Sequence, residues 1–177
     1  MSAMVYLIRH ASPDWERHDL DYYVPPGPPL TETGVQEAAA LGAFLKQAGV
    51  TSLFSSPLER CLHTTQIASQ VTGAVFQVLE GLQEWQPGEQ KCGVQERMLG
   101  SLEIALQAGG QGRSVAMVTH GGPIAALLLA LGMDEATLER HRVYDHRNPL
   151  PTAGAWLATR DGEDQSWNLK LIYPRPD

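Results

Sequence analysis

The sequence has few cysteines, no excess of positive charge and no long hydrophobic run. Only two of its 177 residues are cysteines, Cys61 and Cys92, which is too few for a disulfide framework. Acidic residues outnumber basic ones by 20 to 13, giving a net charge of −7, and this argues against a nucleic-acid-binding protein. The longest apolar run, residues 124–131, is too short to cross a bilayer, and no signal-peptide pattern precedes Val5. We expect a cytoplasmic protein without nucleic-acid or membrane partners.

The composition is that of an ordinary globular protein. Hydrophobic residues make up 43% and charged residues 19% of the sequence, as in typical soluble domains. A chain of this length forms one sizeable domain more readily than two. Since no internal repeat or linker interrupts the pattern, we expect a single domain over residues 1–177.

Continuous apolar runs are typical of strands that are buried on both faces of a sheet. The clearest runs span residues 4–8 and 115–118, and weaker ones span residues 50–54 and 74–79. Between and after them, apolar residues recur at helical spacing, with Thr31 or Thr33 as a candidate N-cap of the first helix. This spacing predicts helices over residues 32–48, 58–71, 94–107 and 123–131.

The last part of the chain has a different pattern. Residues 155–160 and 166–173 are two strand-like runs on either side of Asp161-Gly162, a strong turn signal. Strands that alternate with helices indicate an α/β domain. We therefore predict a three-layer sandwich, with a largely parallel central sheet flanked by helices and a C-terminal β-hairpin.

Charged and reactive residues follow the predicted strands. Ligands of open α/β sheets bind beyond the carboxyl ends of the strands, so these residues are expected to gather at one edge of the sheet. They are Arg9 and His10 after the first strand, Ser55, Ser56 and Arg60 after the second, Glu84 after the third, and Thr119 and His120 after the fourth.

This set of residues suits a phosphate group. The arginine fork pairs with phosphate oxygens and keeps its charge at any working pH. Backbone N–H groups at Gly121 and Gly122, at the start of a predicted helix, favour an anion as well. A neutral imidazole is a competent nucleophile toward phosphorus, and nearby arginines keep it neutral. A carboxyl group such as that of Glu84 can give a proton to the leaving alcohol.

Five motifs, in this order, resemble the histidine phosphatase superfamily, branch 1, the phosphoglycerate-mutase-like group. They are Arg9-His10, "LTETGVQEA" (30–38), "SSPLERCLHTTQIA" (55–68), "LQEW" (82–85) and "THGGPI" (119–124). The resemblance runs from residue 5 to about 125, and "NPLPTAGAWLAT" (148–159) is similar to the family's last core strand.

The resemblance implies covalent phosphoryl transfer through a phosphohistidine at His10. It implies that Arg9, Arg60 and His120 hold the transferred group. Glu84 would be the proton donor to the leaving group, and later the base for water. No metal and no organic cofactor are expected.

The sequence departs from the family's pattern at several points. Ala11 stands where the family often has glycine, and Glu16 stands where many relatives carry an asparagine that touches phosphate. Asp14 is a second candidate for the acid role of Glu84. Only 35 residues separate Glu84 from His120, whereas full-length phosphoglycerate mutases carry a larger insertion there. A phosphatase is therefore favoured over a mutase.

The expected function is a phosphomonoesterase acting on a small phosphorylated metabolite, with His10, Glu84 and His120 catalytic and Arg9, Arg60 and Gly121 binding substrate. Two alternatives are a mutase and a catalytically weak phospho-ligand-binding regulatory protein, for which Glu16 is the best support. The substrate and the oligomeric state stay open. Loops 12–30 and 84–93 are expected to set specificity.

Two further groups of residues, the remaining histidines and the loop aromatics, can be explained without a catalytic role. The spacing of the remaining histidines matches no zinc pattern, so surface or core positions are expected for His18, His63, His141 and His146. Four aromatic residues in the loops either line the substrate side of the cleft or simply pack the loops. They are Trp15, Tyr22, Tyr23 and Trp85.

Overall fold

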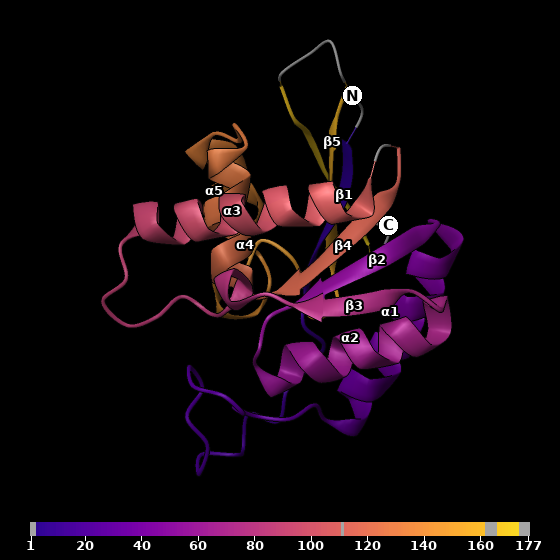
Figure 1. The fold of residues 1–177 in the computed structure, drawn as a ribbon. Helices are drawn as coiled ribbons and strands as arrows, with labels where there is room; N and C mark the ends of the chain where they lie inside the picture. Colours follow the sequence, from indigo (N-terminus) through magenta and orange to yellow (C-terminus); the bar gives the residue numbers. More distant parts are fainter. Residues whose placement is uncertain (1–2, 111, 162–165, 174–177) are drawn as a thin grey trace.

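The fold is an α/β sandwich built on one mixed sheet. The computed structural model describes residues 3–110, 112–161 and 166–173. Its six-stranded sheet has the order β3-β2-β4-β1-β5-β6 (Figure 1). The strands are β1 (Ala3–Arg9), β2 (Val50–Ser55), β3 (Val75–Val78), β4 (Ser114–Thr119), β5 (Ala155–Arg160) and β6 (Asn168–Tyr173). The four strands β3, β2, β4 and β1 pair in parallel, whereas β5 and β6 are antiparallel additions.

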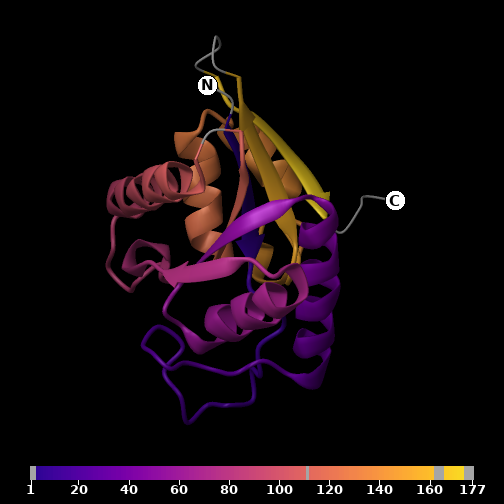
Figure 2. The ribbon, with the colours of Figure 1, turned by 45° about the vertical axis from the view of Figure 1, so that its right-hand side comes forward.

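Helices cover both faces of the sheet, as Figure 2 shows from a second direction. Helices α1 and α2 pack against each other on one face, and α3 and α4 pack on the other. The short helix α5 packs on α4. The bounds are α1 (Glu32–Gln47), α2 (Glu59–Thr72), α3 (Lys91–Gly109), α4 (Gly121–Ala130) and α5 (Glu135–His141).

The central strands are apolar throughout because each of their faces meets a different layer of helices. In β1, Val5 and Leu7 belong to the core shared with α3 and α4, whereas Tyr6 and Ile8 belong to the core shared with α1 and α2. Strand β4 alternates in the same way. Burial on both faces is what produces continuous apolar runs in parallel sheets.

The structure confirms the predicted fold class, with corrections at particular elements. Helix α5, capped by the Asp134 side chain, was not predicted. Helix α4 begins at Gly121 rather than residue 123, and α3 begins at Lys91 rather than residue 94. Thr31, and not Thr33, caps α1, because its side chain accepts a hydrogen bond from the Gly34 N–H.

The predicted hairpin is present as an antiparallel pair of β5 with β6. Its predicted turn at Asp161-Gly162 extends outside the described residues, because Gly162 is not among them. Within the described ranges, no helix is both long and apolar enough to span a bilayer.

Candidate active site

The register of the sheet brings three chain segments together at the carboxyl ends of the parallel strands. Arg9 pairs with Thr119, and the His10 N–H donates to the Thr119 carbonyl over 3.0 Å. The Ser56 N–H donates to the Val118 carbonyl, also over 3.0 Å. As a result the rings of His10 and His120 lie edge to face, with their centroids 5.3 Å apart.

His10 is held in one tautomer by the backbone. Its Nδ1 lies 2.8 Å from the carbonyl oxygen of Ala11, and because a carbonyl only accepts, Nδ1 must carry the proton. Burial, with the nearby charges of Arg60 and Arg9, holds the pKa of His10 well below its usual value. The ring is therefore neutral near pH 7, and its Nε2 has a free lone pair.

The two predicted phosphate-binding arginines are buried and incompletely paired. Three buried side-chain nitrogens in the described part of the chain have no hydrogen-bond partner, and they are Arg9 Nε, Arg60 Nε and Arg60 Nη2. Buried donors are nearly always paired in proteins. Such orphaned guanidinium donors beside a neutral histidine indicate a place for an anion with several oxygens.

His120 is the N-cap residue of α4. One ring nitrogen, Nε2, lies 2.9 Å from Ser56 Oγ, and the other, Nδ1, lies 3.4 Å from Glu84 Oε2. Burial, followed by the charge of Arg60, holds the pKa of His120 well below its usual value. The pair with Glu84 is therefore a contact of a neutral imidazole, not an ion pair.

Glu84 is nearly buried and lies between the other groups. Its Oε2 is 3.5 Å from Arg60 Nη2, and its Oε1 accepts a hydrogen bond of 2.9 Å from the Trp85 N–H. Burial raises the pKa of Glu84, and this outweighs the opposite effects of the Trp85 hydrogen bond and the Arg60 charge. A carboxyl group with a raised pKa is suited to hold a proton until a leaving group takes it.

The segment that carries Glu84 is fixed by Arg97 of α3. The Arg97 guanidinium donates to the carbonyl oxygens of Gly81, Gln83 and Glu84 at 2.8, 2.8 and 3.2 Å. Its remaining N–H groups donate to the carboxylate of Glu89 at 2.6 and 2.9 Å. All five donors are used, so this arginine anchors the loop and has none left for a ligand.

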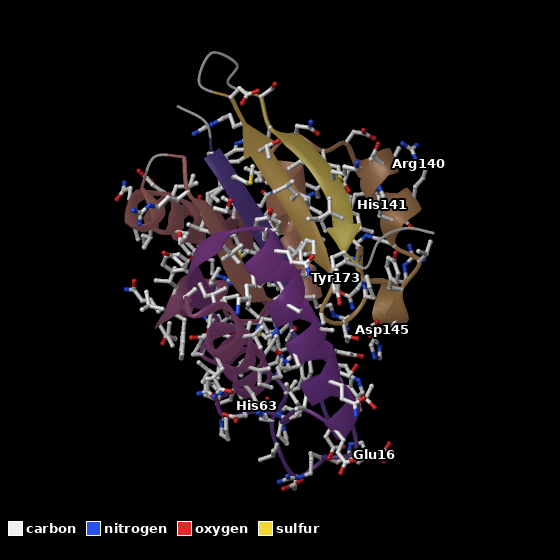
Figure 3. All side chains as sticks on the ribbon, turned by 90° about the vertical axis from the view of Figure 1, so that its right-hand side faces the viewer. Glu16, His63, Arg140, His141, Asp145 and Tyr173 are labelled. Carbon is white, nitrogen blue, oxygen red and sulfur yellow. The ribbon has the colours of Figure 1, made fainter. Side chains whose placement is uncertain are left out.

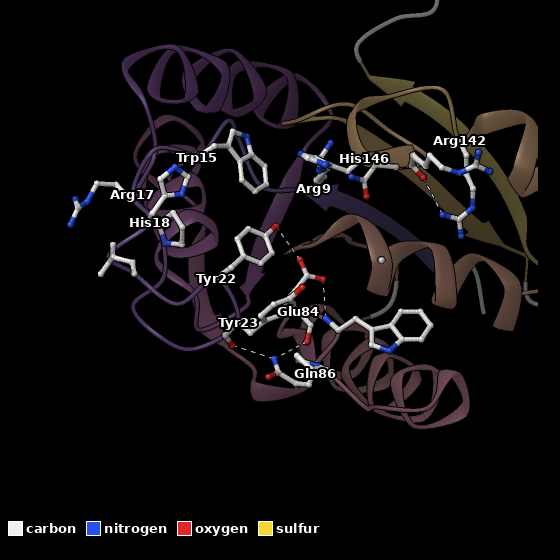
Figure 4. A pocket seen from close by; sticks show the side chains of 17 residues that line it. Arg9, Trp15, Arg17, His18, Tyr22, Tyr23, Glu84, Gln86, Arg142 and His146 are labelled. Carbon is white, nitrogen blue, oxygen red and sulfur yellow. Dashed lines mark hydrogen bonds between the residues drawn. The ribbon is translucent and has the colours of Figure 1, made fainter.

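A pocket of about 940 Å³ opens beside these groups (Figure 4). Arg9, Glu84 and Gly122 lie in its wall, whereas His10, Arg60 and His120 are buried and do not line it. The other lining residues come from three segments, which span residues 15–28, 85–87 and 142–148. The first gives Trp15, Arg17, His18, Leu20, Tyr22, Tyr23 and Pro28, the second gives Trp85, Gln86 and Pro87, and the third gives Arg142, His146, Arg147 and Asn148.

Tyr22 and Glu84 form the boundary between the pocket and the buried groups. The Arg60 guanidinium carbon lies 3.9 Å from the centroid of the Tyr22 ring, and Arg60 Nη1 donates to the Tyr22 carbonyl over 3.0 Å. In Figure 4 the Tyr22 side chain points toward Glu84, which accepts a hydrogen bond from its hydroxyl. The four loop aromatics, Trp15, Tyr22, Tyr23 and Trp85, all line the pocket, as one of the two interpretations of the sequence had it.

Two acidic residues considered from the sequence lie away from this pocket. The Glu16 side chain is 92% exposed and lies 4.0 Å from His18, and Figure 3 shows it at the outer edge of the molecule. Asp14 accepts a hydrogen bond from the Glu16 N–H and does not line the pocket. Glu16 thus points away from the buried groups, as a carboxylate at that motif position must if a phosphate binds there. Of the two acid candidates, only Glu84 meets the buried groups.

Gly121 is needed for packing rather than for lining the pocket. A Cβ atom at this position would lie 1.6 Å from Oδ1 of Asn148. Its neighbour Gly122 lines the pocket instead. Both begin α4, whose first N–H groups lack partners within the helix.

Sequence reasoning missed the segment of residues 142–148. His18 and His146 are exposed, as expected, and both also line the pocket, which the sequence did not indicate. Most important is Asp145, whose carboxylate accepts two hydrogen bonds of 2.6 Å from Arg9. The available signal was the local run of basic residues over 140–147, "RHRVYDHR", which a scan for charge clusters would have marked.

No metal site is apparent in the described part of the chain, where no three His, Cys, Asp or Glu side chains gather in a suitable cluster. The fold and the site together define an α/β protein with a candidate oxyanion site at the carboxyl ends of its parallel strands. The chain belongs to the histidine phosphatase superfamily (branch 1), whose family model matches residues 5–92 and 85–148.

Solved structures of similar fold cover almost the whole chain. The structure of a mycobacterial glucosyl-3-phosphoglycerate phosphatase is 21% identical, covers 97% of this chain and 98% of its own, and has a TM-score of 0.74. Its complex with VO3 is 20% identical over 99% of this chain and 100% of its own, at a TM-score of 0.73. Bacillus stearothermophilus YhfR is 20% identical over 96% of both chains, at a TM-score of 0.76. No curated protein sequence matched the chain.

Proposed function

We propose that the protein is a phosphomonoesterase that transfers the phosphoryl group of a small phosphorylated metabolite to His10 and then to water. The observation that carries this proposal is the set of orphaned Arg9 and Arg60 nitrogens beside a buried, neutral histidine. Two further facts support it. The chain belongs to the histidine phosphatase superfamily, and a structure of the same fold is of a phosphatase that takes up VO3.

The first half of the reaction forms a bond between His10 and phosphorus. Nε2 of His10 attacks the phosphorus atom in line with the ester oxygen, and the P–O bond breaks as the P–N bond forms. Arg9, Arg60 and His120 stabilise the equatorial oxygens, where the charge of the transition state lies. Protonated Glu84 gives its proton to the departing alkoxide, so an alcohol leaves.

The second half regenerates the enzyme. The Glu84 carboxylate takes a proton from a water molecule, whose oxygen attacks phosphorus as the P–N bond breaks. Inorganic phosphate leaves, and His10 is again neutral with its proton on Nδ1. Entry of substrate requires Tyr22 to rotate off Arg60, a motion available to a side chain carried by a surface loop.

The pocket supports a small substrate. Its volume of about 940 Å³ is within the range of small-molecule sites. Its wall combines aromatic rings with the cationic side chains of Arg17, Arg142 and Arg147. The binding-protein alternative loses its best support, because Glu16 faces solvent.

The direct test is hydrolysis of p-nitrophenyl phosphate by wild type and His10→Ala, each with and without EDTA. We expect turnover that EDTA leaves unchanged and that the variant lacks. Quenching of the wild type with alkaline detergent during turnover of ³²P-labelled substrate should trap a phosphoprotein that is stable in base and loses its label in acid. Full activity of His10→Ala would refute the mechanism.

A second assay separates hydrolysis from phosphoryl transfer within a substrate. Incubation with phosphoglycerates should yield free phosphate if they are accepted at all. Isomerisation without phosphate release would identify a mutase instead.

A further inference from the structure

We infer that Asp145 is a positioning residue for Arg9, holding the far end of its guanidinium so that the Nε edge faces the phosphoryl group. The inference rests on the proposed function. Asp145 belongs to the pocket-lining segment that follows α5, and it comes from the 3₁₀ helix η2 (Asp145–Arg147).

The hydrogen bonds of Arg9 leave one edge of the guanidinium free. Its Nη1 and Nη2 atoms each donate to one oxygen of Asp145, both over 2.6 Å, and Nη1 also donates to the Leu150 carbonyl over 3.3 Å. Nε is buried and has no partner among the described residues. Since Nη2 carries a second N–H parallel to that of Nε, the two form a fork that suits two phosphate oxygens.

Arg60 repeats this arrangement with different partners. Its Nη1 donates to the Tyr22 carbonyl over 3.0 Å, and its Nε and Nη2 atoms have no hydrogen-bond partner in the described structure. Two arginines from separate elements, β1 and α2, are thus held from one side, with Nε left unpaired in both. Because both arginines leave the same edge free, we assign Asp145 the role of positioning Arg9. It does not occupy the place where the phosphate would bind.

The charge of Asp145 fits the role. Arg9 is 1% exposed, and a buried cation is costly unless a partner compensates its charge. The hydrogen bonds from Arg9 lower the pKa of Asp145, so its carboxylate is ionised at neutral pH. It holds the Nη1–Nη2 edge of Arg9 and compensates the charge there, which leaves the adjacent Nε–Nη2 edge for the phosphoryl oxygens.

The backbone around Asp145 is itself fixed in place. His146 and Arg147 have positive φ values of 50° and 56°, a conformation that costs a non-glycine residue about 1 kcal/mol or more. The Asn148 side chain donates to the Asp145 carbonyl over 2.9 Å, and Asn148 in turn fits against Gly121. A strained turn held by a side-chain hydrogen bond from Asn148, which itself packs on Gly121, indicates that the position of the carboxylate matters.

The test measures orthovanadate affinity by calorimetry, and kcat and KM for p-nitrophenyl phosphate, in wild type and Asp145→Asn. Misplacing a catalytic contact by about 1 Å can cost on the order of 100-fold, so we expect orthovanadate affinity and kcat/KM to fall about 10- to 100-fold. The matched control is Glu135→Gln on neighbouring α5, which breaks the exposed ion pair of Glu135 with Lys91 of α3. It should leave orthovanadate affinity and kcat/KM unchanged.

A double-mutant cycle shows whether Asp145 acts through Arg9. In an Arg9→Gln background, Asp145→Asn should have little further effect on kcat/KM, because the group that it positions is gone. An equal loss in both backgrounds would overturn the inference. Asp145→Glu, which keeps the charge with a longer reach, should lie between wild type and Asp145→Asn, and thermal unfolding of each variant reports its folding.

Two other outcomes are decisive. Orthovanadate binding by Asp145→Asn that is equal to or tighter than wild type would overturn the positioning role, and tighter binding would identify Asp145 as a competitor for Arg9. Wild type that neither binds orthovanadate nor hydrolyses p-nitrophenyl phosphate would overturn the proposed function, and the inference with it. The two failures are distinguishable because only the second appears in wild type.

Discussion

The hydroxyl of Tyr22 donates a hydrogen bond to Oε2 of Glu84 over 3.3 Å, while the ring of Tyr22 lies on the face of Arg60. One side chain of the 12–30 loop thus contacts both the candidate proton donor and a candidate phosphate ligand. Figure 1 shows this loop as the long indigo segment beyond the strand ends. The electrostatics of the buried site are therefore sensitive to a residue on a surface loop.

Removing the Tyr22 hydroxyl should shift the pH dependence of the reaction. The Tyr22 hydrogen bond lowers the pKa of Glu84, because it stabilises the carboxylate, so Tyr22→Phe should raise this pKa. Glu84 donates only when protonated, and activity on an alkyl phosphate falls as pH rises through its pKa. We expect the high-pH limb of kcat/KM to move to higher pH by about half a unit, as for a hydrogen bond of roughly 0.7 kcal/mol.

The pH profile of kcat/KM, rather than that of kcat, should be measured, since it reports the pKa values of the free enzyme. Tyr23→Phe is the control, because Tyr23 also lines the pocket but its hydroxyl makes no hydrogen bond to Glu84 among the described residues. A shift to lower pH in Tyr22→Phe would contradict the prediction.

The effect of Glu84→Gln should depend on the leaving group. An alkoxide needs a proton as it departs, whereas p-nitrophenolate departs without one. We expect kcat to fall by roughly 100-fold or more on an alkyl phosphate, the usual contribution of general acid catalysis, and much less on p-nitrophenyl phosphate. Steady-state kinetics on the two substrates measure this difference, with Asp14→Asn as the control variant. If Glu84 were not the proton donor, Glu84→Gln would lose the same fraction of kcat on both substrates.

The buried Arg60 side chain should lower the free energy of unfolding of the protein. It is buried, and two of its nitrogens have no hydrogen-bond partner, although Nη2 lies 3.5 Å from Oε2 of Glu84. A buried donor without a hydrogen bond costs about 1–3 kcal/mol. Arg60→Met, of similar length, should therefore raise the free energy of unfolding in urea by about 1–3 kcal/mol, while it abolishes orthovanadate binding.

Arg97→Met is the matched control for Arg60→Met. All five donors of Arg97 are used on the Glu84 loop and Glu89. Its loss should lower the free energy of unfolding by about 2 kcal/mol or more. A change of the free energy of unfolding in the same direction in both variants would refute a cost from the unpaired Arg60 donors.

Gly34 of the "LTETGVQEA" motif should tolerate no larger side chain. A Cβ atom there would lie 2.2 Å from the carbonyl oxygen of Ser12, and the backbone near His10 would have to move. We expect Gly34→Ala to lower the free energy of unfolding by about 1–3 kcal/mol and to reduce kcat/KM. Gly100→Ala, in open space on α3, should instead gain about 0.5–1 kcal/mol. Urea titrations of both variants would test this contrast.

The sequence could predict the elements whose patterns are set by burial on both faces. Strands β1 and β4 are continuous apolar runs for that reason, and the reactive residues at their ends followed from the position of the strands. Helix α5 was missed because it has seven residues and buries only Leu138, too little for a periodic pattern. The described structure brings Arg9, His10, Arg60, Glu84 and His120 together as expected, and their catalytic roles stay predictions.

The direction of a loop side chain could not be predicted. Glu16 matches a motif position, yet the turn around it directs its carboxylate to solvent. Asp145 lies 136 residues from Arg9 in the chain, and only the tertiary fold brings the two together. The basic run around Asp145 marks a charged segment but does not identify Arg9 as its partner, because the turn depends on contacts with Asn148 and Gly121.

The central place of β1 has a consequence for how the protein is made. β1 pairs with β4 and β5, which begin at residues 114 and 155. A ribosome therefore releases this apolar strand long before its neighbours exist, and both of its edges stay open while translation proceeds. The candidate site, which takes residues from the ends of β1, β2 and β4, cannot form on a short nascent chain. Instead, β1 stays unpaired during synthesis, and its place in the sheet is complete only once residues 155–160 of β5 have emerged.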